Sequence, residues 1–212
     1  MEVLNNYQRK KIDESNDEEF YSSPKFVYHL DANFRQYLSS VYENEIVDYS
    51  TVLDLMSSWD SYLPKGKKYK KVIGHGLNKQ ELEKNKIFDS YWIQNFNLNQ
   101  EIPLDDRTID CCLMVAAWQY LQYPENLTRE ISRILRNNGK FIIAFSNRAF
   151  WHKAPNIWTT STEEERVKYV RKVLISNGFN EPKIIKKFNE PALNFFNFLN
   201  KDPFYCLIAT KE

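Results

Sequence analysis

The chain has 212 residues, of which 42% are apolar and 15% aromatic, with only 5 glycines. This composition fits one globular domain with a few additional elements and excludes disordered and fibrous proteins. The 29 basic and 28 acidic residues give a formal net charge of +1. Because no excess of positive charge favours nucleic acid or an anionic membrane, we expect a small-molecule partner.

The cysteines and the apolar runs indicate the compartment. Cys111, Cys112 and Cys206 have neither the even count of a disulfide framework nor the spacing of a zinc site, which is typical of a reducing environment. No apolar run approaches the ~20 residues needed to cross a bilayer, and the start of the chain has no apolar signal core. We expect a cytoplasmic protein without a membrane span. The sequence leaves its oligomeric state open.

The N-terminal part is divided by its composition. Residues 1–20 are polar and charged, and we expect a flexible N-terminus. The aromatic stretch that begins at Phe20 and Tyr21 starts an ordered segment, which extends to residue 48. Within this segment, Asp31 is a plausible N-cap of a helix at about 31–44, whose apolar residues recur with helical spacing: Phe34, Leu38, Val41 and Tyr42.

From residue 49 onward, short apolar runs alternate with amphipathic segments. "TVLDL" at 51–55 and "KKVIG" at 70–74 are strand-like, and 78–85 begins with Asn78 and Glu81 at capping-box spacing. A short strand near 91–96 follows. The almost uninterrupted apolar run at 108–117 is typical of a strand buried on both faces.

Two further helices and three strands complete the pattern. The segment 124–139 carries an apolar helical stripe between Pro124 and Gly139: Leu127, Ile131, Ile134 and Leu135. The second helix, at 161–179, has Ser161/Glu164 or Thr162/Glu165 as its capping pair and Gly178 as its stop. The remaining strands are expected at 140–146, 182–187 and 204–211.

Strands that alternate with helices predict a Rossmann-like, doubly wound and mostly parallel sheet, because a parallel neighbour is reached only through a crossover. The segment between the last two strands, 188–202, contains Pro191 and no clear long helix. We therefore expect the chain to end in an antiparallel strand pair.

Three stretches carry a resemblance that covers about residues 50–212. They are "VLDL", "VIGHGLNKQEL" and "IPLDDRTIDCCLMVAAWQYLQYPENLTREISRILRNNGKFIIAFSNR". In this order they resemble the class I S-adenosylmethionine-dependent methyltransferase superfamily, most closely the methyltransferase type 11 group and the quinone-biosynthesis methyltransferases. "FYSSPKFVYHLD", "DLMSSWDSYLP" and "FSNRAFWHKA" resemble a branch of it common in cyanobacteria and plastids.

The resemblance implies S-adenosylmethionine as cofactor, but three cofactor motifs are degenerate. The superfamily carries a glycine-rich loop after the first strand, an acid for the ribose hydroxyls after the second, and an Asp for the adenine amine. Here these positions fall at Met56, Gly76 and Asn95. The two lost charge-assisted hydrogen bonds are worth roughly 1.5–3 kcal/mol each, so other contacts are needed. The expected cofactor residues are Asp54, Ser57, Ser58, Trp59, Gly74, His75, Asn78, Asn95, Phe96 and Ala116.

The acceptor pocket is expected beyond the carboxyl ends of the strands, where ligands bind in doubly wound sheets. Its expected residues are Tyr21, Trp118, Gln119, Tyr120 and Arg148, with His29 and Tyr120 as candidate bases. The resemblance also implies that residues 21–48, which include Tyr21 and His29, form an N-terminal lid or cap over the acceptor. A base is needed only if the acceptor must lose a proton. Structural roles without a ligand stay open for three of the expected cofactor and acceptor residues: a helix cap for Asp54, packing for Trp59, and a surface ion pair for Arg148.

Two other functions remain open. The absent glycines and acids favour a catalytically inactive methyltransferase-like protein that binds a metabolite or a protein partner. A nicotinamide dehydrogenase is disfavoured because no "GxGxxG" begins the first crossover. The scattered His29, His75 and His152 give no metal-binding pattern, so no metal is expected.

Overall fold

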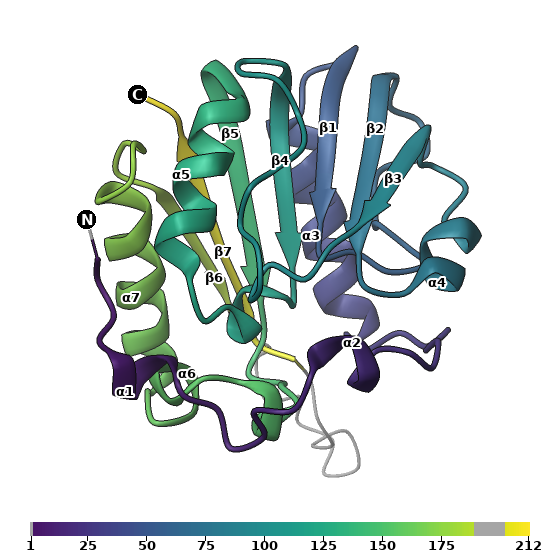
Figure 1. The fold of residues 1–212 in the computed structure, drawn as a ribbon. Helices are drawn as coiled ribbons and strands as arrows, with labels where there is room; N and C mark the ends of the chain where they lie inside the picture. Colours follow the sequence, from purple (N-terminus) through teal and green to yellow (C-terminus); the bar gives the residue numbers. More distant parts are fainter. Residues whose placement is uncertain (1, 189–201) are drawn as a thin grey trace, which may run out of the picture.

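The structure is a computed structural model that describes residues 2–188 and 202–212. Within these residues one seven-stranded sheet has the order β3-β2-β1-β4-β5-β7-β6 (Figure 1). The strands are β1 (Ser50–Leu55), β2 (Tyr69–Gly76), β3 (Ser90–Ile93), β4 (Ile109–Val115), β5 (Leu135–Phe145), β6 (Lys183–Lys187) and β7 (Phe204–Thr210).

Strand direction confirms the expected sheet. β1 pairs in parallel with both β2 and β4, and β3 and β5 extend the parallel part on either side. β7 runs antiparallel to its two neighbours, β5 and β6. The order reverses between β1 and β4, which is the point where doubly wound sheets open a crevice at the carboxyl ends of their strands.

Helices cover both faces of the sheet (Figure 1). α3 (Ala32–Glu45) packs its buried stripe on one face, and α5 (Pro124–Ile134) and α7 (Glu163–Ile175) pack on the other. Neighbouring β4 residues therefore belong to different cores, Cys111 on the α3 side and Cys112 on the α5 side. The shorter helices are α1 (Asn6–Arg9), α2 (Asp17–Phe20), α4 (Lys79–Lys84), η1 (Trp118–Tyr120), η2 (Trp151–Lys153) and α6 (Asn156–Thr159).

Several helix ends match the sequence patterns. Asp31 caps α3 by accepting from the Phe34 amide, and Thr162 and Glu165 form the reciprocal capping box of α7. Gly178 follows α7 with a φ of +94°, a left-handed conformation that glycine adopts without strain. Most of the predicted loop 188–202 lies outside the described residues.

α5 is shorter than the sequence predicts. We expected a helix that ends just before Gly139, but α5 ends at Ile134, and Leu135 has the extended backbone that begins β5. Leu135 pairs with Ile109 at the start of β4 and is fully buried there. The apolar side chain that fitted the helical stripe is therefore a core residue of the sheet.

Residues 2–20, expected to be flexible, follow the domain surface in the structure. Figure 1 shows this segment, with α1 and α2, crossing below the carboxyl ends of the parallel strands. Glu125 at the start of α5 accepts hydrogen bonds from the Val3 and Leu4 amides, both at 2.8 Å, and forms an ion pair with Arg9 at 3.0 Å. These contacts attach the first residues of the N-terminal segment to the start of α5.

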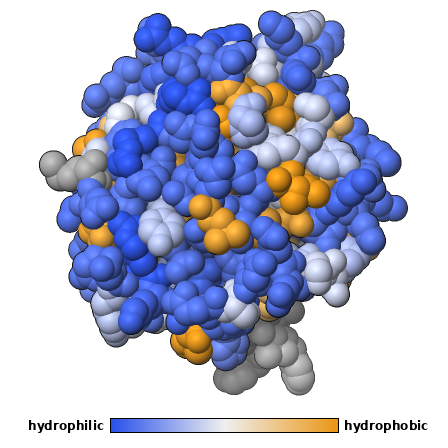
Figure 2. Space-filling view, in the orientation of Figure 1, coloured by the Kyte–Doolittle hydropathy of each residue, from blue (hydrophilic) through white to orange (hydrophobic). Residues whose placement is uncertain are grey.

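The outer surface in this view is largely hydrophilic, with hydrophobic residues in separate patches (Figure 2). No helix in the described part of the chain is both long enough and apolar enough to span a bilayer.

Candidate functional site

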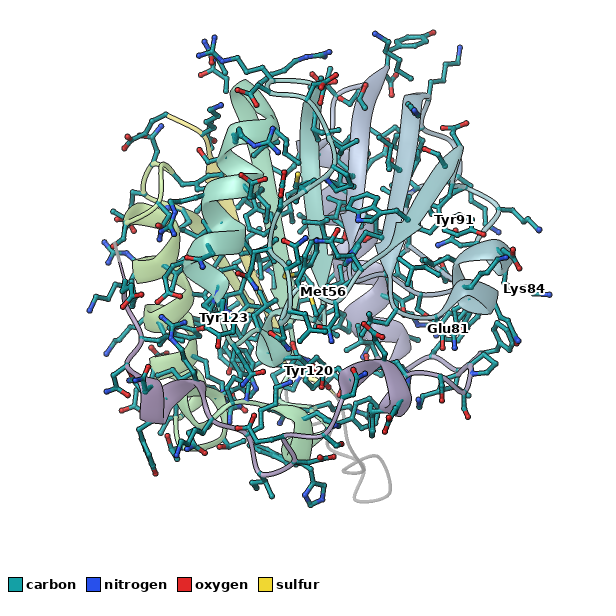
Figure 3. All side chains as sticks on the ribbon, in the orientation of Figure 1. Met56, Glu81, Lys84, Tyr91, Tyr120 and Tyr123 are labelled. Atoms are coloured by element: carbon teal, nitrogen blue, oxygen red, sulfur yellow. The ribbon has the colours of Figure 1, made fainter. Side chains whose placement is uncertain are left out.

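A cavity of about 740 Å³ lies at the carboxyl ends of β1, β2 and β4. Its walls come from the loops after these strands, from η1, from the loop after β5 and from the N-terminal segment. Figure 3 shows Met56 and Tyr120 at the lower ends of the strands, with Glu81 on α4 to their side. The volume falls in the range of small-molecule sites, about 300–1,000 Å³.

The loop after β1 is bound to the end of β2 through His75. The Met56 amide donates to His75 Nδ1 at 3.1 Å, and the Ser57 amide donates to the His75 carbonyl at 2.7 Å. The Nε2–H of His75 then donates to the Gln94 carbonyl at 2.9 Å. Burial lowers the pKa of His75 to about 3. The imidazole is therefore neutral at physiological pH and serves as a connector.

Met56 adopts the left-handed backbone conformation, with a φ of +52°. This conformation usually requires glycine and costs a non-glycine residue of order 1–3 kcal/mol. The hydrogen bond to His75 holds the strained residue in place. The chain thus keeps a glycine-like turn after β1 without a glycine.

Gly76, where the superfamily carries its ribose acid, has no room for a side chain. A Cβ atom on Gly76 would lie 2.6 Å from the Ser57 carbonyl oxygen, closer than van der Waals contact allows. The close approach of the β1 loop therefore excludes an acid at this position.

Asp54, the next-to-last residue of β1, supplies a buried carboxyl group to the cavity. It is 3% exposed and accepts a hydrogen bond from Ser57 Oγ at 2.6 Å. Burial raises its pKa to about 7, against the lowering effect of hydrogen bonds from Ser57 and Ser61, and nearby Asp60 adds a further small increase. No cation among the residues that the structure describes contributes to this balance. A positively charged ligand would therefore stabilise the carboxylate form.

The start of α4 connects the β1 loop to residues 21–25. Asn78 Oδ1 caps α4 by accepting from the Glu81 amide, while its Nδ2 donates to the carbonyls of Tyr21 and Ser22 at 2.8 and 3.0 Å. The buried Glu81 carboxylate accepts from Ser58 Oγ at 2.5 Å and from the Lys25 amide at 2.6 Å. Glu81 therefore fixes both the β1 loop, through Ser58, and the segment of Lys25.

The loop after β3 and the end of β4 complete this half of the cavity. The Phe96 ring stacks on His75 with ring centroids 4.0 Å apart, and Asn95 Oδ1 accepts from the Asn97 amide at 2.9 Å. Ala116 follows β4 with a φ of +50°. All three expected residues, Asn95, Phe96 and Ala116, line the cavity.

The other half of the cavity is aromatic. The predicted residues Tyr21, His29, Gln119, Tyr120 and Arg148 all line it. Tyr120 Oη accepts from the Phe150 amide at 3.0 Å, and the rings of these two residues stack. Arg148 Nε forms an ion pair with Asp202. An ion pair was the alternative to a substrate contact in the sequence analysis.

Tyr21 and the two candidate bases, His29 and Tyr120, differ in how burial shifts their pKa values. Desolvation raises the pKa of Tyr21 and of Tyr120, so both phenols are neutral at physiological pH. Desolvation lowers the pKa of His29, which favours its neutral, proton-accepting form. Among the residues that the structure describes, no group of three or more His, Cys, Asp or Glu side chains is placed to hold a metal ion.

Residues 61–143 match a family model described as a methyltransferase domain, of type 11. A SAM-dependent methyltransferase from Thermotoga maritima is 19% identical, with a TM-score of 0.59 over 85% of this chain and 90% of that one. One from Aquifex aeolicus is 15% identical, with a TM-score of 0.60 over 92% and 97%. Geranyl diphosphate C-methyltransferase from Streptomyces coelicolor is 11% identical, with a TM-score of 0.55 over 84% and 78%. A search of the curated proteins found no match.

The fold is that of the class I methyltransferases. The superfamily resemblance predicted from the sequence is thereby confirmed. Relative to this fold, two of the three degenerate motifs lie where the β1 loop meets β2, at Met56 and Gly76, and the third, Asn95, lies across the cavity.

Three residues predicted for the methyltransferase site do not line the cavity: Trp59, Gly74 and Trp118. The Trp59 ring packs on Tyr28 and its Nε1 donates to the Val27 carbonyl at 3.3 Å. The Phe88 ring covers the position of a Cβ on Gly74.

Trp118 is 1% exposed and belongs to the core on the α5 side. It follows β4 directly, but its side chain turns away from the strand end and packs near Phe141 and Tyr169. The prediction that the Trp118 indole faces the cavity was wrong, because a position directly after a strand does not determine the direction of the side chain.

Glu81 and Lys153 are among the cavity residues that were not predicted as site residues. Glu81 was singled out only for its capping-box spacing, and its cavity role depends on partners distant in sequence. Lys153, 1% exposed, reaches the cavity wall and forms an ion pair with Asp13 at 3.0 Å. A lysine in "WHKA" gives no sequence signal of burial.

Proposed function

We propose that this chain is an S-adenosylmethionine-dependent methyltransferase that acts on a small-molecule acceptor. The observation that carries the proposal is the cavity at the carboxyl ends of β1, β2 and β4, whose buried Asp54 carboxyl is balanced by no cation from residues 2–188 or 202–212. A ligand bearing both a sulfonium and an ammonium group complements this carboxyl. The similar geranyl diphosphate C-methyltransferase is described in complex with S-adenosylhomocysteine, which supports the same cofactor here.

The residues that would hold the cofactor follow two strands, β1 and β3. Asp54 and Ser57 lie at the end of β1, while Asn95 and Phe96 lie after β3, where the ring of Phe96 offers an apolar face. Bound S-adenosylmethionine supplies a methyl group on a sulfonium sulfur, whose departure as a neutral thioether leaves the protein the tasks of alignment and water exclusion. Residues 21–25, held by Asn78 and Glu81, form part of the cavity wall and would serve the second task.

The acceptor would lie in the aromatic half. His29, whose neutral form is favoured by desolvation, is the residue best suited to take a proton from an acceptor that must lose one. The neutral phenols of Tyr21 and Tyr120 would orient the acceptor by hydrogen bonding.

Calorimetric titration with S-adenosylmethionine and S-adenosylhomocysteine tests the proposal. We expect one-to-one binding that weakens by about ten- to a hundredfold in Asp54→Asn, because a charge-assisted interaction worth about 1.5–3 kcal/mol is lost. The exposed Asp48→Asn makes the same charge change at the far end of β1 and should bind as the wild type does. No heat at millimolar ligand would contradict the proposal.

A second function is favoured by one observation. Gly76 has no room for an acid and the Asn78 amide is engaged by the N-terminal segment, so two groups suited to ribose are absent or occupied. These features fit a methyltransferase-like protein that binds a metabolite or a protein without turnover. Methyl transfer from labelled S-adenosylmethionine to any component of a metabolite extract would exclude this alternative. Cofactor binding without transfer would favour it.

A further inference from the structure

Segment 21–30 carries two residues of the aromatic half of the cavity, Tyr21 and His29, but forms neither helix nor strand. It lies between α2 and α3, and three of its side chains are 46–56% exposed: Phe26, Val27 and Tyr28. A segment with few buried contacts has low local stability. Its position at the cavity therefore depends on the residues outside it that hold it.

Glu81 holds segment 21–30 and the β1 loop with the same carboxylate. Oε1 accepts from the Lys25 amide at 2.6 Å, and Oε2 accepts from Ser58 Oγ at 2.5 Å. Glu81 is 9% exposed, and a buried carboxylate oxygen is destabilised when it loses its donor. A shift of Ser58 in the β1 loop is therefore passed to Lys25 through this carboxylate.

Trp59 makes a second connection, which does not pass through α4. Its Nε1 donates to the Val27 carbonyl at 3.3 Å, and its ring lies on that of Tyr28, with centroids 4.6 Å apart. Tyr62 also approaches the Tyr28 ring, with centroids 6.2 Å apart. Trp59 was predicted to contact the cofactor, but its indole packs on segment 21–30. Its contacts join this segment to the β1 loop.

The β1 loop also contains groups proposed to bind the cofactor. Ser57, the neighbour of Ser58, donates from its Oγ to the buried Asp54 carboxyl at 2.6 Å. Asn85, directly after α4, donates to the Ser58 carbonyl at 3.0 Å and to Ser61 Oγ at 2.9 Å. A ligand held by Asp54 and Ser57 would therefore restrict the rest of the loop. When one segment is already restricted, ordering a second segment bonded to it costs less conformational entropy.

We propose that Glu81 and Trp59 are positioning residues that couple the β1 loop to segment 21–30, so that cofactor binding completes the site of the methyl acceptor. The inference rests on the proposed methyltransferase function. Glu81 acts through Lys25, and Trp59 acts through Val27 and Tyr28. The consequence is ordered binding, in which the cofactor binds first and the acceptor second. Coupling is reciprocal, so a bound acceptor tightens cofactor binding by the same factor.

Hydrogen exchange over residues 21–30, measured by mass spectrometry with and without saturating S-adenosylhomocysteine, tests the coupling. In the wild type we expect the ligand to slow exchange at least about fivefold, the lower end of typical coupling between two sites. Ser58→Ala removes the hydrogen bond to Glu81 but none of segment 21–30, and should reduce the slowing to about half. Adding Trp59→Leu should abolish it. Glu83→Gln, which breaks an exposed pair with Lys79 on α4, should retain the wild-type slowing.

The ratio of exchange rates with and without ligand separates coupling from a purely structural role, which would change both rates alike. Full slowing in the double variant would mean direct contact between ligand and segment 21–30, and overturns the inference. Full slowing in Ser58→Ala overturns the role of Glu81, even if the double variant does not fold.

Calorimetry on the same samples separates this inference from the methyltransferase proposal. If S-adenosylhomocysteine binds without slowing exchange in the wild type, the coupling is overturned and the methyltransferase proposal stands. If it does not bind, the methyltransferase proposal fails, and the ligand-free proteins test the connection. Residues 21–30 should then exchange faster in Ser58→Ala than in the wild type, and equal rates would overturn the connection.

Discussion

The carbonyl oxygen of Ser57 occupies the space that a side chain on Gly76 would need. A Cβ there would meet this oxygen at 2.6 Å. The Ser57 amide is at the same time bonded to the His75 carbonyl at 2.7 Å, so the β1 loop cannot move away without losing a hydrogen bond. The close approach explains the absent ribose acid as a consequence of how this loop packs.

Gly76→Ala is expected to destabilise the protein. The added methyl group meets backbone, and overpacking of this kind typically costs about 1–3 kcal/mol. Thermal unfolding followed by circular dichroism measures the loss. Gly66→Ala is the matched control, because nothing lies within 4 Å of its Cβ position, and its midpoint should stay close to that of the wild type. Equal midpoints for the two variants would show that the loop is not held against β2.

The pH dependence of stability should reveal the buried Asp54. Its pKa is about 7 in the folded protein and about 3.9 in an unfolded chain, so folding favours the protonated form. Its contribution is full below about pH 4 and is lost as pH rises through about 7. Relative to Asp54→Asn, the wild-type free energy of unfolding should fall by roughly 1.4 kcal/mol per pH unit in this window. Urea titrations at several pH values give the slope. A difference independent of pH would place the carboxyl in contact with water.

The contribution of His75 to the free energy of unfolding should have the opposite pH dependence. Burial lowers its pKa from 6.5 to about 3, so its contribution to stability is present above about pH 6.5 and is lost as pH falls toward 3. In His75→Gln this acid-dependent loss disappears. The variant is also less stable at pH 8, because the hydrogen bonds of the Met56 amide and the Gln94 carbonyl are weakened. The carbon-bound proton signals of His75, followed by NMR from pH 8 to 5, should not titrate. A midpoint near 6.5 would contradict the buried connector.

Local patterns predicted the frame of the fold. The spacing of Asp31 and the apolar residues of α3 is sufficient to predict this helix. The Thr162/Glu165 pair, three residues apart, likewise predicts the start of α7. The end of α5 was wrong because Leu135 fits a helical stripe and a strand equally well. Its pairing with Ile109, far away in the sequence, decides between them.

The site was predictable where it follows strand ends. Asp54, His75 and Gln119 reach the cavity because parallel strands bring their carboxyl ends together. Glu81 could not be predicted as a connector, since its partners Lys25 and Ser58 are 56 and 23 residues away. Trp59 and Trp118 were predicted as site residues, but their side chains pack on Tyr28 and in the core instead.

Glu125→Gln should release the N-terminal segment. The Glu125 carboxylate is 1% exposed and binds the Val3 and Leu4 amides together with Arg9. Removing one partner of a buried ion pair costs about 3–5 kcal/mol because the other charge is left uncompensated. Hydrogen exchange measured by mass spectrometry should show faster exchange over residues 2–10 than in the wild type. Glu164→Gln breaks the exposed pair with Lys186, which is worth about 0–1 kcal/mol, and should leave residues 2–10 protected. Unchanged protection in Glu125→Gln would mean that the contacts of α1 with α6 hold the segment without the ion pair.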